Sequence, residues 1–84
     1  MKKSIPTADV REKIKHHIDL WLKDETEAKA SAQNCASNPS LQRVIALRAH
    51  EYRSMAQALY FLGRSLGIIS ADDYPQFGRE ERQL

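Results

Sequence analysis

The sequence contains two stretches of alternating four- and three-residue spacing, separated by the pair Asn38–Pro39. The first follows Ile14, Ile18, Trp21, Glu25, Ala28, Ala32 and Cys35. The second follows Leu41, Ile45, Arg48, Tyr52, Met55, Leu59, Leu62, Leu66 and Ile69. This spacing is typical of amphipathic helices that meet along a seam. It predicts an all-α fold in which two helices form an antiparallel hairpin.

Residues that favour helix starts and stops mark the ends of both predicted helices. Thr7 is suited to cap the first, and no Gly or Pro follows until Pro39, which predicts a helix of roughly thirty residues. Asn38 is suited to cap the second helix, because Pro39 tolerates the first helical position. We expect this helix to end near Leu66, with Gly67 as the residue that follows the cap.

The remainder of the chain is shorter and less regular. Ser70–Asp73 is similar to a capping box and predicts a third helix, which Pro75 and Gly78 should limit to little more than one turn. Gly63 is expected either to allow close packing or to fray the end of the second helix. The predicted organisation is a flexible arm at 1–6, a hairpin domain at 7–77 and a flexible charged tail at 78–84.

The two seams predict which side chains meet across the hairpin. Reflection about residue 38 pairs Trp21 with Met55, Ile18 with Leu59, Ile14 with Leu62, and Val10 with Leu66. Small residues after Glu25 predict a hairpin that is narrow near its turn and wide at its open end. Glu25 and Arg48 each interrupt a seam, and they are expected either to form an ion pair or to extend separately into solvent.

The second helix carries more apolar side chains than one neighbouring helix covers. The additional ones are Val44, Leu47, Ala58, Tyr60 and Phe61, and a separate stripe of Ala49, Ala56 and Gly63 favours close approach of another helix. Because an exposed surface of this kind is rare on small monomers, we expect a homodimer with a four-helix arrangement. The alternative is that the third helix and Phe77 fold back over Phe61 within one chain.

Composition and motifs exclude several classes of function. The chain has 84 residues, one cysteine and a formal net charge of +2, so we expect one cytoplasmic domain without a disulfide. The apolar run at 58–69 is too short to span a membrane and Arg64 interrupts it. His16, His17, His50 and Cys35 do not form a metal-ligand or nucleophile pattern. We therefore expect no metal, no cofactor and no enzymatic activity.

A binding function remains, with two hypotheses. The first is a protein-interaction module, such as an inhibitor, adaptor or regulatory subunit, whose partner binds exposed aromatic residues beside an arginine. The residues predicted for that surface are Tyr60, Phe61, Arg64, Tyr74 and Phe77. The alternative is a nucleic-acid-binding regulator using basic helix faces. Its predicted contact residues are Lys13, Lys15, Arg43 and Arg53. Residues 66–74 resemble an ending common in small bacterial and phage helical proteins, and this resemblance implies no function.

Overall fold

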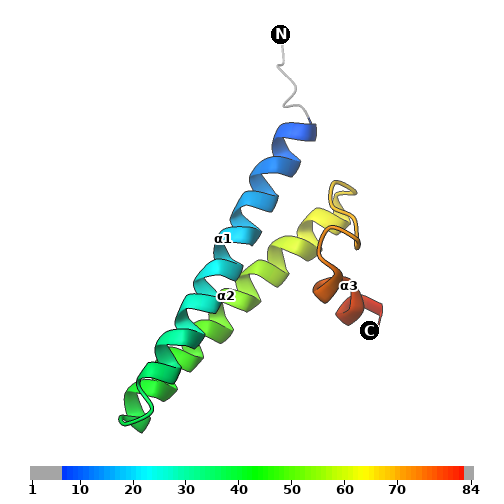
Figure 1. The fold of residues 1–84 in the computed structure, drawn as a ribbon. Helices are drawn as coiled ribbons and strands as arrows, with labels where there is room; N and C mark the ends of the chain where they lie inside the picture. The colour runs from blue at the N-terminus through cyan, green and yellow to red at the C-terminus, as the bar shows by residue number, and fades with distance from the viewer. Residues whose placement is uncertain (1–6, 83–84) are drawn as a thin grey trace.

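A computed structural model describes residues 7–82, which form three α-helices. The helices are α1 (Thr7–Asn34), α2 (Pro39–Ser65) and α3 (Pro75–Arg82). α1 and α2 lie side by side in opposite directions and are joined by a short turn (Figure 1). The predicted all-α hairpin is confirmed. The predicted arm at 1–6 and the last two residues of the predicted tail lie outside the described residues.

The ends of α2 follow the local sequence signals. The Asn38 side chain accepts a hydrogen bond from the Leu41 N–H at 3.2 Å, and Pro39 is the first helical residue. At the other end Gly67 has φ +72°, which an L side chain rarely adopts. The Gly67 N–H donates to the Arg64 carbonyl and the Ile68 N–H to the Gly63 carbonyl, both at 3.0 Å. These two bonds form a Schellman motif, so both predicted caps are confirmed.

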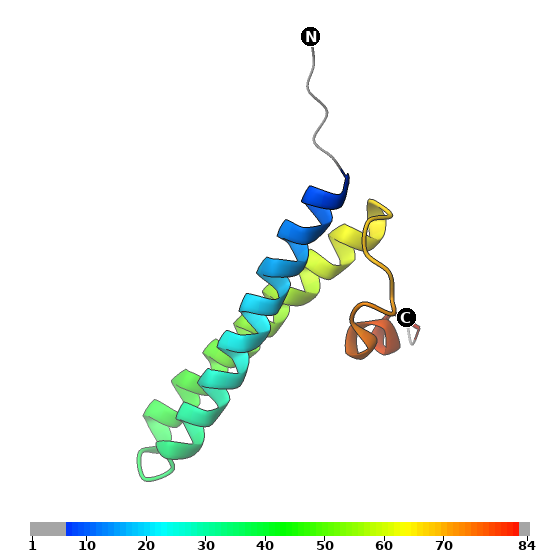
Figure 2. The same cartoon turned by 45° about the horizontal axis from the view of Figure 1, so that its top comes forward.

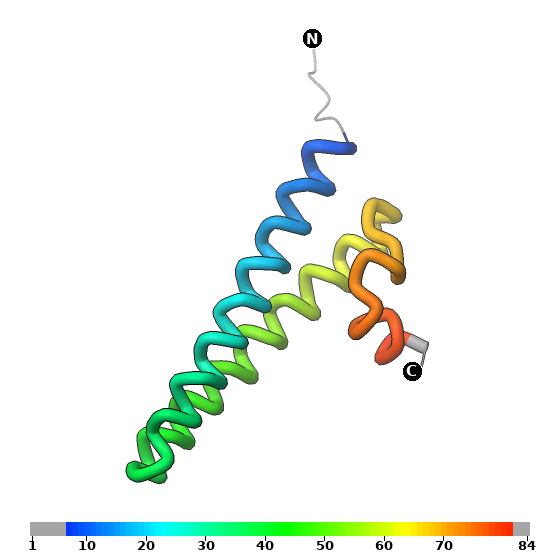
Figure 3. The backbone as a smooth tube through the Cα atoms, in the orientation of Figure 1, coloured from blue at the N-terminus to red at the C-terminus, as the bar shows by residue number. Residues whose placement is uncertain are grey.

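The hairpin is a thin, tapered layer. α1 and α2 lie closest near the turn and diverge towards the N-terminal end of α1, as the tube in Figure 3 shows. The smallest principal extent is 14 Å, little more than the ~10 Å diameter of one helix. Figure 2 shows α3 beside the C-terminal part of α2. None of the described helices has the length and apolar character needed to cross a bilayer.

The buried core lies at the open end of the hairpin and draws on all three helices and the segment that joins α2 to α3. Its buried members are Ile18, Ala56, Tyr60, Ile69, Tyr74 and Phe77. Gly63 permits this arrangement, because a Cβ atom there would lie 2.5 Å from Ile69 Cδ1. Of the two roles that the sequence left open for Gly63, the structure shows close packing. Phe77 contacts Tyr60, and α3 folds back over this end of α2 within one chain, as in the alternative described above. That alternative placed Phe77 over Phe61, which here is partly buried against the same core.

The predicted seam of the second helix is correct for Tyr52 and Leu59, which pack inside the chain, but wrong in its rotation for four other members. Leu41, Met55, Leu62 and Leu66 are 43–59% exposed. The residues of α2 that are buried are Ala49, Ala56, Tyr60 and Gly63. Trp21 stacks on Tyr52 with ring centroids 5.9 Å apart, not on Met55. The physical reason is that α2 packs on two neighbours: its small residues admit α1 and Ile69, and Tyr60 packs beneath α3.

The third helix also differs from its prediction. The Ser70 N–H donates to Asp73 Oδ2 at 2.9 Å, as in a capping box, but the helix begins only at Pro75. Gly78 does not end it; this residue is buried, and a Cβ atom there would lie 2.8 Å from the Ala71 carbonyl oxygen. Residues 78–82, which the sequence assigns to a flexible tail, are helical. Pro75 fits a first helical position, where its missing N–H is not needed.

Candidate interaction surface

Residues 66–82, here called the C-terminal segment, are held against one face of the hairpin by polar contacts. Arg11 donates to Asp73 at 2.8 Å, and Lys15 lies 3.7 Å from the same carboxylate. The Ser70 N–H and these cations hold the pKa of the Asp73 carboxyl below its usual value. The Tyr74 hydroxyl donates to Asp19 at 2.8 Å. These contacts fix the segment to α1.

Two glutamates of α3 make the matching contacts to α2. Arg53 and Gln57 donate to Glu80 at 3.0 and 2.7 Å. The Tyr60 hydroxyl donates to Glu81 at 2.7 Å, and Arg64 forms an ion pair with the same residue at 3.1 Å. The donors on α2 lie three or four residues apart, so they share one helix face. That face is therefore occupied within the chain.

The aromatic residues predicted as a partner surface lie in these intrachain contacts. Tyr60 and Phe77 are fully buried and Tyr74 is nearly so, with their rings 5.3–6.2 Å apart. Burial and the hydrogen bond to Asp19 raise the pKa of Tyr74, and burial and Glu81 raise that of Tyr60. These three residues do not form an exposed surface, which corrects the sequence interpretation. Phe61 and Arg64 are partly buried and remain partly accessible.

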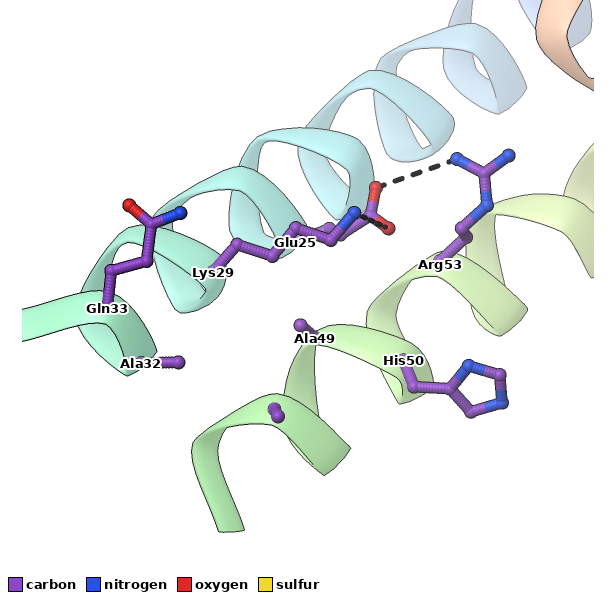
Figure 4. A pocket seen from close by; sticks show the side chains of 8 residues that line it. Glu25, Lys29, Ala32, Gln33, Ala49, His50 and Arg53 are labelled. Carbon is purple, nitrogen blue, oxygen red and sulfur yellow. Dashed lines mark ion pairs between the residues drawn. The ribbon is translucent and has the colours of Figure 1, made fainter. Parts of the chain in front are cut away.

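The charged residue in the α1 seam, Glu25, is buried, with 8% of its side chain exposed. Its carboxylate lies 3.2 Å from Lys29 and 3.8 Å from Arg53, as Figure 4 shows. Arg53 also lies over the Phe77 ring, 5.0 Å from its centroid. Of the two alternatives for Glu25 and Arg48, the ion pair is wrong, because α2 is rotated so that Arg53 faces Glu25. Extension into solvent holds for the exposed Arg48 but not for the buried Glu25. A groove of about 360 Å³ with Ala32, Ala49 and His50 along it borders this cluster.

The opposite side of α2 has no cover within the described chain. Five large apolar residues lie there in two groups, one near each end of α2, and are 43–59% exposed; they form the open face, which consists of Leu41, Val44, Met55, Leu62 and Leu66. Leu62 follows Arg53 by nine residues, which is about 180° around a helix of 3.6 residues per turn. The open face therefore lies across the helix from the face that α3 covers. Leu47, 58% exposed, flanks it.

A second groove borders the open face near the turn. It has a volume of about 360 Å³ and is lined by Ala28, Ser31, Val44, Ile45, Arg48 and Tyr52. Its α1 wall consists of small side chains, and its α2 wall includes the exposed Val44. This groove therefore adds a concave part to an otherwise convex apolar face.

The four basic residues of the nucleic-acid alternative are not gathered on one surface. Lys15 is paired with Asp73, and Arg53 with Glu25 and Glu80. Lys13 and Arg43 are exposed, but Lys13 lies in the first two turns of α1 and Arg43 in the first two turns of α2, so they are near opposite ends of the antiparallel hairpin. The nucleic-acid alternative stays a prediction. Among residues 7–82 no group of three His, Cys, Asp or Glu side chains is close enough to hold a metal ion.

Sequence reasoning missed the open face because it placed the same leucines in the intrachain seam. The available signal was the competing stripe of Ala49, Ala56 and Gly63, which faces the interior of the chain.

Comparison with known proteins assigns no family: no protein-family model, no curated protein and no solved structure matches this chain. The class that the structure defines is an all-α helical hairpin with a third, docked helix.

Proposed function

We propose that the chain is a protein-interaction module that acts by binding and not by catalysis, as an inhibitor, adaptor or regulatory subunit. Its proposed contact surface is the open face. The observation that carries the proposal is a row of large apolar side chains on one side of α2, each about half exposed, in two groups at 41–44 and 55–66 with Arg48 and Glu51 between them. Contiguous apolar patches on small soluble domains mark sites of interaction.

The architecture supports the same proposal. A helical layer is stable when its apolar faces are covered by a second layer. Here the C-terminal segment covers one face, and the described chain has no element left for the other. A partner that supplies an apolar helix face would complete the second layer, with side chains at Val44, Met55 and Leu62 as anchors. The open face replaces the buried aromatic residues as the proposed surface.

Site-directed photocrosslinking in the native host tests the proposal. A photoreactive phenylalanine analogue is placed at Leu62 on the open face and, as a control, at Lys23, an exposed polar position of α1. We expect a crosslinked protein band from position 62 and a much weaker one from position 23. Crosslinks of equal yield at both positions, or none at position 62, would refute the open face as an interaction surface.

A further inference from the structure

The partner of the open face is identifiable from its charges and shape. We infer that it is a second copy of this chain, bound in an antiparallel α2–α2 dimer whose two-fold axis passes between Arg48 and Glu51. This inference rests on the proposed function and names the partner. The resulting assembly has two hairpins in contact through α2, with the C-terminal segments on the outside.

Charge complementarity supports this arrangement. Arg48 and Glu51 lie on or beside the stripe of the open face, three residues apart. Neither takes part in an ion pair within the part of the chain that the structure describes. In the antiparallel register Arg48 of each copy faces Glu51 of the other, which gives two equivalent ion pairs. A parallel dimer in register would instead place like charges together, which costs binding energy.

Shape complementarity follows in the same register. When position 48 faces position 51 of the second copy, Val44 faces Met55 of that copy. Met55 is exposed, and Val44 lines the groove beside Ala28 and Tyr52. Methionine fills irregular apolar gaps because its unbranched side chain is flexible. Met55 of each copy therefore packs against the groove beside Val44 of the other copy. The two-fold axis makes these two contacts equivalent, as an isologous interface requires.

The inferred contact runs along most of α2. In this register residues 39–60 of one copy overlap the same residues of the other, a length of about 33 Å at 1.5 Å per residue. With a helix about 10 Å wide, the footprint is about 330 Å² per copy, below the ~800 Å² per partner of a standard interface, so we expect a weak, concentration-dependent dimer. In the inferred register Leu41 faces Ala58 of the second copy and lies next to Leu62 of that copy, which extends the apolar contact to the turn.

Charge-reversal variants test both the partner and the register. Arg48→Glu and Glu51→Arg each create two like-charge contacts in the dimer, and we expect each to weaken self-association by about tenfold or more. An equimolar mixture of the two variants restores opposite charges at both contacts, so we expect a heterodimer of near wild-type affinity. The double variant should form homodimers again. Sedimentation velocity measures self-association, and native mass spectrometry separates heterodimers from homodimers.

The mixture is the decisive sample. If a substitution weakened association by disturbing its own helix, association would stay weak after mixing. If it weakened association by breaking the intermolecular ion pair, mixing would restore association. Wild-type protein that remains monomeric at about 100 μM, far above the micromolar range of weak specific dimers, would refute the second copy as partner. Crosslinking from position 62 to a different protein would then still support the proposed function. A dimer that neither single variant weakens, or whose single variants are not rescued by mixing, would refute the inferred register.

Discussion

Gly63→Ala is the most informative single change in the core, because two opposing effects of known size meet there. Alanine gains about 1 kcal/mol over glycine inside a helix. However, the added methyl group would lie 2.5 Å from Ile69 Cδ1, 2.7 Å from Cγ1 and 3.0 Å from Cβ. Ile69 is only 2% exposed and its Cβ cannot move without its backbone. Inserting a methylene into such a site costs about 1–3 kcal/mol, so after the gain of about 1 kcal/mol we expect a net loss of up to about 2 kcal/mol.

A double-mutant cycle with Ile69→Ala makes the expectation specific. Ile69→Ala alone should cost about 2–5 kcal/mol because it removes buried methylene groups. In that background the same Gly63→Ala change meets no Cγ1 or Cδ1 atom and only the Cβ atom, at 3.0 Å, remains close, so we expect it to stabilise the protein by up to about 1 kcal/mol. We therefore predict that Gly63→Ala lowers the free energy of unfolding in the wild-type chain and raises it in the Ile69→Ala chain. Such a change of sign is a large coupling energy for two residues in contact.

Urea denaturation followed by circular dichroism at 222 nm measures the four free energies of unfolding, at one protein concentration because association contributes to stability. Ala30→Gly, at an exposed position inside α1, provides the matched control for helix propensity without a packing effect. If Gly63→Ala stabilises the wild-type chain by the same amount that Ala30→Gly destabilises it, Ile69 does not restrict position 63. The account of the core would then be refuted.

Three further predictions concern the contacts around the core. Arg53→Met should destabilise the protein by about 1–2 kcal/mol in urea denaturation, because it removes the hydrogen bond to Glu80 and leaves the buried Glu25 carboxylate with Lys29 alone; an unchanged midpoint would contradict this role. Because the folded pKa of Asp73 is lowered, its contribution is present above the unfolded value of about 3.9 and is lost as pH falls through the folded pKa. The stability difference between wild type and Asp73→Asn should therefore shrink below about pH 4, and a difference constant with pH would refute it. Trp21→Ala should cost about 2–4 kcal/mol, since the ring is partly buried and stacks on Tyr52; a melting temperature within a few degrees of wild type would refute this contact.

The parts of the fold that depend on local sequence were predictable. Asn38 and Pro39 specify where α2 begins, and Gly67 specifies where it ends, because caps require only neighbouring residues. The existence and antiparallel order of α1 and α2 follow from their length and the short joint. The interaction surface was not predictable in the same way. It depends on which face of α2 is left uncovered, and distant residues decide that.

The rotation of α2 shows how those distant residues act. A two-helix argument gives each apolar stripe one partner, and the leucine stripe is the stronger one in sequence. The C-terminal segment changes the balance, because Ile69 and Phe77 bury large apolar surface only if the side of α2 with Gly63 and Tyr60 faces inwards. The same rotation brings Arg53, and not Arg48, to Glu25. The C-terminal segment, whose helix α3 the sequence predicts to be little more than one turn, therefore determines which face of α2 turns towards α1.

The displaced leucine stripe connects the fold to the proposed function. Leu41, Met55, Leu62 and Leu66 belong to the stripe of four- and three-residue spacing that the sequence predicts as a seam. Tyr52 and Leu59 of that stripe pack inside the chain, whereas these four residues do not. On the proposed function another chain covers this exposed stripe, and the reciprocal charges at positions 48 and 51 favour an identical chain. On the proposed function, the sequence pattern correctly indicates that this side of α2 packs on a helix, but that helix belongs to another chain. The C-terminal segment then has two roles: it closes the core on one side of α2, and it leaves the other side free to bind.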